Sequence, residues 1–286
     1  MRCFIYTFLL ITAQMFSATA ADLQGVLKRI SVSGEIKIGY IAAERPMSFE
    51  DQAGKPVGYS IDLCAHIASA VKKELGREHL AEIFIPVTAE NRFSALETGE
   101  IDILCGATTK TLSRSERVDF TQLTFVTGAS LVSREDDIVA SIESLQGKRV
   151  AVVSNTTTID ALKRRIAEAK VDAQVVAVGS ADEGMDMLDR GDVDAFSSDQ
   201  VVLIGLVAGA DESQRYLISG ELFSFEPFAL AIPRDDSDFR LLADRALSKL
   251  NRTGKIWDIY AKWFSRFSKS PPKALVGLYL LNTTPE

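Results

Sequence analysis

Arg114 is the residue whose type and position point most directly to ligand chemistry. It lies where the loop after a predicted strand turns into a helix. A guanidinium offers a planar fork of N–H groups that matches a carboxylate with two parallel hydrogen bonds. Free backbone N–H groups at a helix start attract the same kind of anion. The segment therefore predicts a site for a small carboxylate; a solvated helix face shared with Arg117 is the alternative.

A second set of hydrogen-bonding groups is predicted far along the chain. Residues 154–157 leave one predicted strand and start a helix, so Thr156 and Thr157 can offer hydroxyl and N–H groups to a ligand. Ordinary helix capping explains the same residues. Asp199 follows another short strand, and its spacing alone fits an exposed helix cap as well as a ligand contact. Spacing therefore leaves both interpretations open for all three residues.

The sequence offers no recognisable set of residues for catalysis or metal binding. Its only histidines, His66 and His79, fall in an amphipathic helix and a polar loop, without partners at base-like or metal-ligand spacing. It contains no Gly-rich phosphate loop, nucleophile elbow or zinc motif. We therefore predict no catalytic residue, no metal and no cofactor.

An eight-residue motif that occurs twice indicates how the polar residues are positioned. Residues 96–103, LETGEIDI, return nearly unchanged as residues 188–195, LDRGDVDA. In each copy a glycine just past a helix takes the left-handed conformation at little cost, and a buried strand follows. Two distant copies suggest two lobes built on one plan. A cleft between two such lobes is a natural place for a small molecule.

Strands and helices alternate in both halves, which indicates an α/β fold with mostly parallel sheets. The predicted strands are residues 36–40, 83–87, 101–104, 149–153, 174–178 and 195–196. The predicted helices are residues 23–30, 61–75, 91–97, 157–169, 181–188, 239–250 and 256–264. Two further β-rich runs, residues 128–133 and 228–233, are predicted to cross between the lobes as a hinge.

These crossing runs set the predicted domain boundaries. Lobe 1 comprises residues 21–130 and 231–266, and lobe 2 is an insertion of residues 131–230. Two consecutive prolines at 271 and 272 are expected to end regular structure. Residues 267–286 are therefore predicted to form an extended C-terminal tail.

Residues 1–20 have the three-part layout of a secretory signal peptide. The single charge of Arg2 precedes the apolar run 4–13, and small residues at 18–20 mark the predicted cleavage site. A transmembrane anchor would need about 20 apolar residues, and this run is shorter. We therefore expect an exported protein of the periplasm.

Composition bears on the partners and on the cysteines. The formal net charge of −7 argues against nucleic-acid and anionic-lipid partners, and we expect a monomer. Cys3 precedes the predicted cleavage site. Cys64 and Cys105 can pair in an oxidising compartment, and two buried thiols are an equally good interpretation.

Several motifs resemble the extracellular solute-binding proteins of polar amino-acid ABC transporters, family 3. They are GYSIDL at 58–63, GATT at 106–109 followed by an arginine, and VDFT at 118–121. The resemblance runs in order through most of the chain. ENR at 90–92 and CGATT at 105–109 are most similar to the glutamate/aspartate-binding branch. The resemblance implies the two-lobed periplasmic-binding-protein fold of type II.

The resemblance also implies a receptor that captures a polar L-amino acid, acidic or amide, and delivers it to an ABC membrane permease. Burying either charge of an amino acid unpaired costs several kcal/mol or more. The family pattern assigns the α-carboxylate to Arg114 and Thr109. It assigns the ammonium to Asp199 and the carbonyl of Ala107. Without the resemblance, Arg92 would be predicted to be a surface charge. In the family pattern it matches an arginine that reaches the ligand's side chain.

Some positions depart from the glutamate/aspartate-binding pattern. Ile41 stands where that branch has a second arginine, Ala89 replaces a hydroxyl-bearing residue, and Ala181 lies near the place of a histidine. Glu44, in the same loop as Ile41, would repel an acidic side chain or attract a cationic one. The ligand's class is predicted by these residues, and its identity is not.

Two other functions remain open at the level of sequence. An enzyme on the same scaffold, such as a dehydratase, would need a general acid in the cleft, and Glu44 is the one candidate. A sensory module that signals to a membrane partner would be favoured by a fused transmembrane segment, and the sequence shows none.

Overall fold

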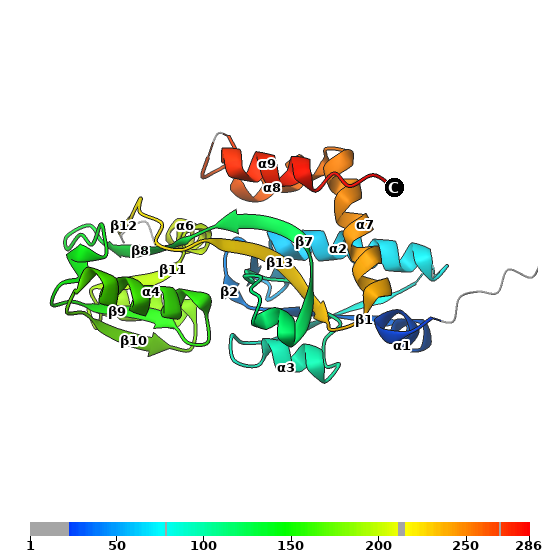
Figure 1. Ribbon diagram of the computed structural model, residues 1–286, viewed down its shortest axis with the longest axis horizontal. Coiled ribbons are helices and arrows are strands. Elements are labelled where there is room, and N and C mark those ends of the chain that lie inside the picture. The colour runs from blue at the N-terminus through cyan, green and yellow to red at the C-terminus, as the bar shows by residue number, and fades with distance from the viewer. Residues whose placement is uncertain (1–22, 78, 211–214, 269) are drawn as a thin grey trace, which may run out of the picture.

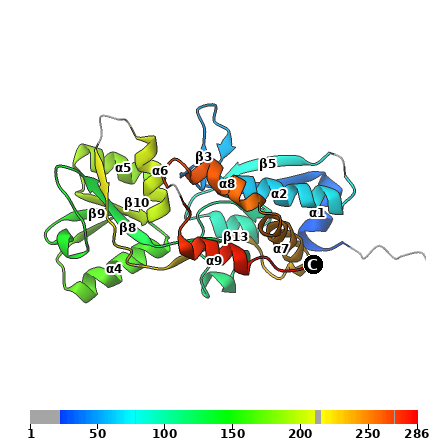
Figure 2. The same cartoon turned by 90° about the horizontal axis from the view of Figure 1, so that it is seen from above.

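Two five-stranded sheets, each covered by helices, form the two lobes of the computed structural model (Figure 1). It describes residues 23–77, 79–210, 215–268 and 270–286. The predicted signal peptide, residues 1–20, lies outside the described residues. Seen from above, the lobes lie side by side along the longest axis (Figure 2). The predicted two-lobed α/β fold is confirmed.

The first lobe contains the sheet of order β5-β1-β6-β13-β7. Its strands are β1 (Glu35–Tyr40), β5 (Ala81–Pro86), β6 (Ile103–Leu104), β7 (Val118–Thr127) and β13 (Glu226–Pro233). Strands β5, β1 and β6 are parallel, and β13 is antiparallel to β6 and β7. The associated helices are α1 (Gly25–Ser33), α2 (Tyr59–Glu74), α3 (Arg92–Glu97), α7 (Ser237–Arg252), α8 (Lys255–Phe264) and α9 (Lys273–Leu281).

The second lobe repeats this plan with the sheet of order β10-β9-β11-β8-β12. Its strands are β8 (Ala129–Arg134), β9 (Arg149–Val153), β10 (Gln174–Val178), β11 (Ala195–Asp199) and β12 (Tyr216–Ile218). Its helices are α4 (Thr157–Ala169), α5 (Ala181–Arg190) and α6 (Gln200–Gly209). Strands β10, β9 and β11 are parallel, as predicted from the alternating pattern.

A small antiparallel sheet projects from the first lobe. It contains β2 (Ala43–Glu44), β3 (Ser48–Glu50) and β4 (Pro56–Val57). Strand β2 contacts α5 and α6 of the second lobe, so this sheet lies at the boundary between the lobes.

The chain crosses between the lobes twice. The long strand β7 ends at Thr127 and β8 begins at Ala129, which places Gly128 at the first crossing (Figure 1). A Cβ atom at Gly128 would lie 2.4 Å from the carbonyl oxygen of Ser224, which belongs to the return segment. The two crossing segments therefore pack against each other closely enough to require a glycine.

The two copies of the eight-residue motif make equivalent contacts in the two lobes. Asp102 accepts a hydrogen bond from the backbone N–H of Lys37 at 2.8 Å. Its counterpart Asp194 accepts one from the N–H of Arg149 at 2.6 Å. Each carboxylate thus satisfies a donor of the neighbouring strand, which explains why the motif carries aspartate at this position.

The expectation of an extended C-terminal tail was wrong, because residues 273–281 form the helix α9. Leu275 and Tyr279, one helical turn apart, are buried against the first lobe, where α9 contacts β7. The hydroxyls of Tyr279 and Tyr59 lie 2.5 Å apart. The prolines precede the helix, where a missing N–H costs nothing. No described helix is long and apolar enough to cross a membrane.

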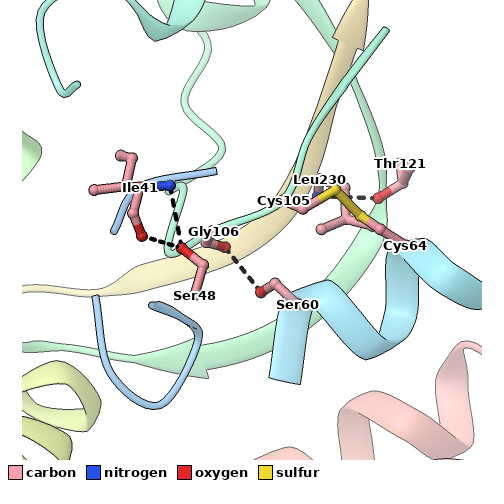
Figure 3. Close-up of a disulfide and its surroundings, with 8 residues drawn as sticks. All are labelled: Ile41, Ser48, Ser60, Cys64, Cys105, Gly106, Thr121 and Leu230. Carbon is pink, nitrogen blue, oxygen red and sulfur yellow. Dashed lines mark hydrogen bonds between the residues drawn. A yellow bond between two sulfur atoms is a disulfide. The ribbon is translucent and has the colours of Figure 1, made fainter. Parts of the chain in front are cut away.

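Cys64 and Cys105 form a disulfide, which settles the alternative that the sequence left open (Figure 3). The bond joins α2 to the end of β6, with the two Cα atoms 6.4 Å apart. One turn before Cys64, the hydroxyl of Ser60 donates to the carbonyl of Gly106 at 3.0 Å. The loop that begins at Gly106 is therefore anchored to α2 at two neighbouring points.

Candidate ligand-binding site

A cavity of about 190 Å³ lies between the lobes and is lined by residues of both. All seven residues that the sequence nominated for ligand contact line it: Arg92, Ala107, Thr109, Arg114, Thr156, Thr157 and Asp199. The three departures from the family pattern, Ile41, Ala89 and Ala181, line it too. His66 and His79 are not among its lining residues. Among the described residues, no group of acidic, His and Cys side chains is arranged to hold a metal.

Arg114 is half-buried at the start of a 3₁₀ turn, Arg114–Glu116. Its Nη1 donates to the carbonyl of Thr109 at 2.8 Å, which fixes the direction of the guanidinium. Burial lowers the pKa of Arg114 to about 10, and the positive charge of Arg92 contributes, so the side chain stays charged at neutral pH. Arg117 instead lies exposed and pairs with Glu97 at 2.7 Å. The alternative of one solvated arginine face is therefore wrong.

Arg92 is the first residue of α3, and its side chain is only 2% exposed. Its Nη2 donates to the carbonyl of Asn155 in the second lobe at 3.1 Å, and the guanidinium stacks over the ring of Phe93. Its Nε has no partner within the described part of the chain. Burial lowers the pKa of Arg92, and Glu44 and Asp199 oppose that effect. A residue that looks like a surface charge in the sequence is a buried cation on the cavity wall.

Asp199 stands on the opposite wall, at the end of β11 and just before α6. It is buried and makes no side-chain capping bond, so the interpretation as an exposed helix cap was wrong. Its Oδ1 is without a hydrogen-bond partner among the described residues. Burial raises the pKa of the Asp199 carboxyl well above its usual range, with further contributions from Glu226 and Glu44. A cation brought into the cavity would lower it again.

Thr156 and Thr157 have different roles at the start of α4. The hydroxyl of Thr156 caps the helix by accepting from the N–H of Ile159 at 3.4 Å, and it donates to the carbonyl of Val153 at 2.7 Å. The hydroxyl of Thr157 donates to Glu226 at 2.7 Å. The capping interpretation therefore holds for Thr156, and the proton of neither hydroxyl is directed to the cavity.

Glu226 is the residue that sequence analysis missed. It begins β13 and is 2% exposed, and its Oε2 accepts from the hydroxyls of Thr109 and Thr157, each at 2.7 Å. Its Oε1 accepts from Ser224 at 2.6 Å. The one signal in the sequence is a carboxylate two residues before the apolar crossing run 228–233. Because each hydroxyl has one proton, Thr109 and Thr157 can offer only lone pairs of their hydroxyls to a ligand. This corrects the expectation that those hydroxyls donate.

Glu44 lines the cavity at the end of β2. Its Oε2 accepts from the N–H of Ala107 at 2.8 Å, and a Cβ atom at Gly106 would lie 2.8 Å from the same oxygen. Burial raises the pKa of Glu44 to about 7, although Arg92, the Ala107 hydrogen bond and Arg114 oppose the shift. Gly106 thus leaves room for a carboxylate that sits directly against the loop backbone.

The lobes also meet at a backbone contact outside the cavity. A Cβ atom at Gly205 of α6 would lie 2.3 Å from the carbonyl oxygen of Arg45, in the turn after β2. Together with the bond from Arg92 to Asn155 and the Glu226 cluster, this contact shows that the lobes are closed around the cavity.

Comparisons with known proteins connect this site to a family. The family described as bacterial extracellular solute-binding proteins, family 3, matches residues 36–266. The L-glutamate/L-aspartate-binding protein of Pseudomonas aeruginosa is 33% identical over 268 residues, which are 93% of this chain and 88% of that protein.

Solved structures show the same fold with different ligands. An ancestral arginine-binding protein has a TM-score of 0.72 in structures bound to arginine and to glutamine. Its identity to this chain is 29% and 31% in the two, with 81% of this chain and 98% of that chain covered. The ancestral amino acid-binding protein AncCDT-1, a precursor of cyclohexadienyl dehydratase, has a TM-score of 0.72 at 27% identity, covering 84% of this chain and all of its own.

Proposed function

This chain belongs to the bacterial extracellular solute-binding proteins of family 3, and from that membership we propose that it captures a polar L-amino acid and delivers it to an ABC permease. The relative from Pseudomonas aeruginosa is named for binding two such amino acids. The cavity between the lobes has charged groups of both signs on its walls.

One observation carries the proposal. Arg92 in the first lobe and Asp199 in the second are buried on the walls of one cavity, each with an atom that lacks a partner among the described residues. A buried donor or acceptor without a partner costs about 1–3 kcal/mol, and more when it is charged. A ligand that brings an acceptor group to Arg92 and an ammonium to Asp199 satisfies both walls at once.

The ligand's groups are assigned from this geometry. We assign the α-carboxylate to the guanidinium of Arg114 and to the N–H groups at the start of α4, where Thr156 and Thr157 stand. We assign the ammonium to Asp199, the carbonyl of Ala107 and the lone pairs of Thr109. Arg92 is left for the ligand's side chain.

Closure follows from the division of these contacts between the lobes. Arg92 and Arg114 belong to the first lobe, and Asp199 and Thr157 to the second, so a bound amino acid favours the closed form by its differential affinity. We propose that the permease recognises this closed form. We propose lobes of residues 21–130 with 231–266, and of residues 131–230; the crossing strand β13 spans the second boundary and pairs in the sheet of the first lobe. We also propose a monomer, exported to the periplasm by the signal peptide at residues 1–20.

An enzymatic function is the second candidate, because one structural neighbour is named as the precursor of a dehydratase. Glu44 would be its general acid, since a pKa of about 7 suits proton transfer. We propose binding without turnover, because both histidines lie away from the cavity lining and the matched relatives are named as binding proteins. Recovery of the ligand unchanged after prolonged incubation with the protein tests this choice.

Calorimetry on two arginine variants tests the binding assignment. The ligand is first identified by a thermal-shift screen of the twenty amino acids, since a binder stabilises the folded state by mass action. Arg114→Ala should then weaken binding by about 2–5 kcal/mol, roughly 30-fold or more, because it removes one partner of a buried charge pair. Arg117→Ala is the matched control and should bind normally. Normal binding by Arg114→Ala would show that the α-carboxylate is held elsewhere.

A further inference from the structure

We propose that the cavity prefers an amino acid with a neutral, amide-bearing side chain to one of the same shape with a carboxylate, and that Glu44 sets this preference. The inference rests on the proposed function and names the substrate class of the same site. The relative from Pseudomonas aeruginosa is named for binding two acidic amino acids, so the proposal predicts a different ligand from that protein's.

The charges that line the cavity are balanced. Its charged lining residues are two arginines, Arg92 and Arg114, and two carboxylates, Glu44 and Asp199. The carboxylate of Glu226 lies behind the wall, where three hydroxyls hold it. The zwitterion common to all amino acids uses Arg114 and Asp199. The ligand's side chain is therefore left with one cation, Arg92, and one anion, Glu44.

Glu44 is fixed in the position from which it acts on the ligand. Its Oε2 accepts from the N–H of Ala107 at 2.8 Å, and Gly106 packs against the same oxygen. The carboxylate lies at the base of the loop that supplies Ala107 and Thr109 to the cavity wall. Turning Glu44 away from a ligand would break the bond to Ala107, so an acidic ligand cannot avoid the repulsion at little cost.

Arg92 does not neutralise Glu44 by direct contact. No ion pair within 4.0 Å joins Arg92 to Glu44 in the described part of the chain. The guanidinium is instead held by the Asn155 carbonyl and the Phe93 ring, and its Nε lacks a partner among the described residues. The neutral hydroxyls of Ser180 and Ser198 also line the cavity. Among its charged groups, one donor and one acceptor therefore remain for the ligand's side chain.

An amide is the group that satisfies both. Its oxygen accepts from Arg92 and its NH₂ group donates to Glu44, whereas a carboxylate only accepts and meets Glu44 with like charge. The nearby lining residues Ile41, Ala89 and Ala181 supply no further side-chain donor that would offset this repulsion. A cationic side chain would find Glu44 but would be repelled by Arg92, so the neutral side chain is favoured over both charged kinds.

Calorimetry with two pairs of nearly isosteric amino acids tests the proposal. Glutamine is compared with glutamate, and asparagine with aspartate, at about pH 8 for the wild type and Glu44→Gln. Of glutamine and asparagine, the one that binds the wild type more tightly should bind at least about tenfold more tightly than the corresponding acid. The reason is that like charges close together in a site cost affinity. Glu44→Gln should lower the ratio of amide affinity to acid affinity about tenfold, mainly by increasing the affinity for the acid. Its amide oxygen can still accept from Ala107, so the loop is retained.

Glu50→Gln is the matched control, because Glu50 lies outside the cavity lining and accepts from the Tyr40 hydroxyl at 2.8 Å. Its amide-to-acid ratio should equal that of the wild type. A wild type that binds the acids or arginine more tightly than the amides overturns the proposal, even if Glu44→Gln fails to fold. An unchanged ratio in folded Glu44→Gln overturns the role of Glu44. A protein that no amino acid stabilises contradicts the proposed function itself.

Discussion

The carboxylate of Glu226 lies 2.7 Å from the hydroxyl of Thr157, so one short hydrogen bond joins a strand of the first lobe to a helix of the second. The same oxygen also accepts from Thr109 of the first lobe at 2.7 Å. Both hydroxyls are thereby oriented with their lone pairs available to the cavity. Glu226 thus acts as a positioning residue: it makes Thr109 on one wall and Thr157 on the other hydrogen-bond acceptors toward the cavity.

Glu226→Gln should weaken amino-acid binding and lower the stability of the closed form. Glutamine is neutral, so the bonds from Thr109, Thr157 and Ser224 lose their charge assistance, and its NH₂ group cannot accept the hydroxyl proton that it faces. Such bonds contribute about 1.5–3 kcal/mol, or roughly a 10- to 150-fold loss of affinity if the bond forms only in the closed state. Calorimetry and denaturant unfolding measure the two effects.

Ser224→Ala provides the comparison for that variant. It removes the Ser224 bond to Oε1 of Glu226 and the bond that the same hydroxyl accepts from the N–H of Ala129, and it keeps both threonine bonds. Its affinity loss should be clearly the smaller of the two. Equal losses in Glu226→Gln and Ser224→Ala would mean that Glu226 only stabilises the crossing segment.

Gly205→Ala should hinder closure without touching the ligand. The new methyl group would lie 2.3 Å from the Arg45 carbonyl oxygen, a contact that exists only when α6 meets the turn after β2. Overpacking of this kind costs about 1–3 kcal/mol, or roughly fivefold to a hundredfold in affinity. The ligand-free thermal transition should not fall, because alanine is the better helix former. Solution scattering should show a ligand-saturated protein more expanded than the wild type.

Gly209→Ala, on the same helix, is the matched control for the closure experiment. Its methyl group would lie 3.5 Å from the Cδ atom of Arg45, which is an ordinary contact. We expect wild-type affinity and wild-type compaction from it. If Gly205→Ala binds as tightly as Gly209→Ala, then closure does not bring α6 against Arg45 in solution.

Features encoded by local sequence were predicted, and those that depend on distant contacts were not. The motif glycines Gly99 and Gly191 have φ angles of 72° and 73°, as their positions after helices require. The burial of Arg92 has no local signal, because it depends on Asn155 in the other lobe. Glu226 was missed for the same reason, since its partners lie 117 and 69 residues away.

The C-terminal helix shows how a local signal can mislead. Two prolines suggested an end to regular structure, yet proline is also favoured at a helix start. The apolar residues Leu275 and Tyr279 that follow have helical spacing and are buried by packing on β7. The spacing was readable from the sequence, but the surface that buries them was not.

The Cys64–Cys105 disulfide should contribute to stability. It closes a loop with a sequence separation of 41, for which chain entropy predicts about 4 kcal/mol. The double variant Cys64→Ala/Cys105→Ala should therefore unfold at lower denaturant concentration than the oxidised wild type. Reduction of the wild type should produce a similar decrease, which separates loss of the bond from loss of the sulfur atoms. Reduced and oxidised proteins that unfold together would contradict the expectation.

The preference between glutamate and glutamine should depend on pH through Glu44. Burial raises the pKa of this carboxyl to about 7, so its charge is present above that pH and lost below it. A bound glutamate side chain favours the protonated form and raises the pKa further, so its binding takes up a proton. Glutamate affinity should therefore be highest below about pH 7. It should fall as the pH rises above 7, by at most about tenfold per pH unit.

The other charged groups that face Glu44 are Arg92, Arg114 and Asp199. The carboxyl of Asp199 also has a raised pKa, but it meets the ammonium that both ligands share, so its titration cancels in the ratio of the two affinities. Calorimetry at about pH 6, 7 and 8, in buffers of different ionisation enthalpy, measures both the ratio and the proton uptake. In Glu44→Gln the ratio should no longer change with pH. A wild-type ratio that is constant over this range would show that Glu44 stays in one protonation state.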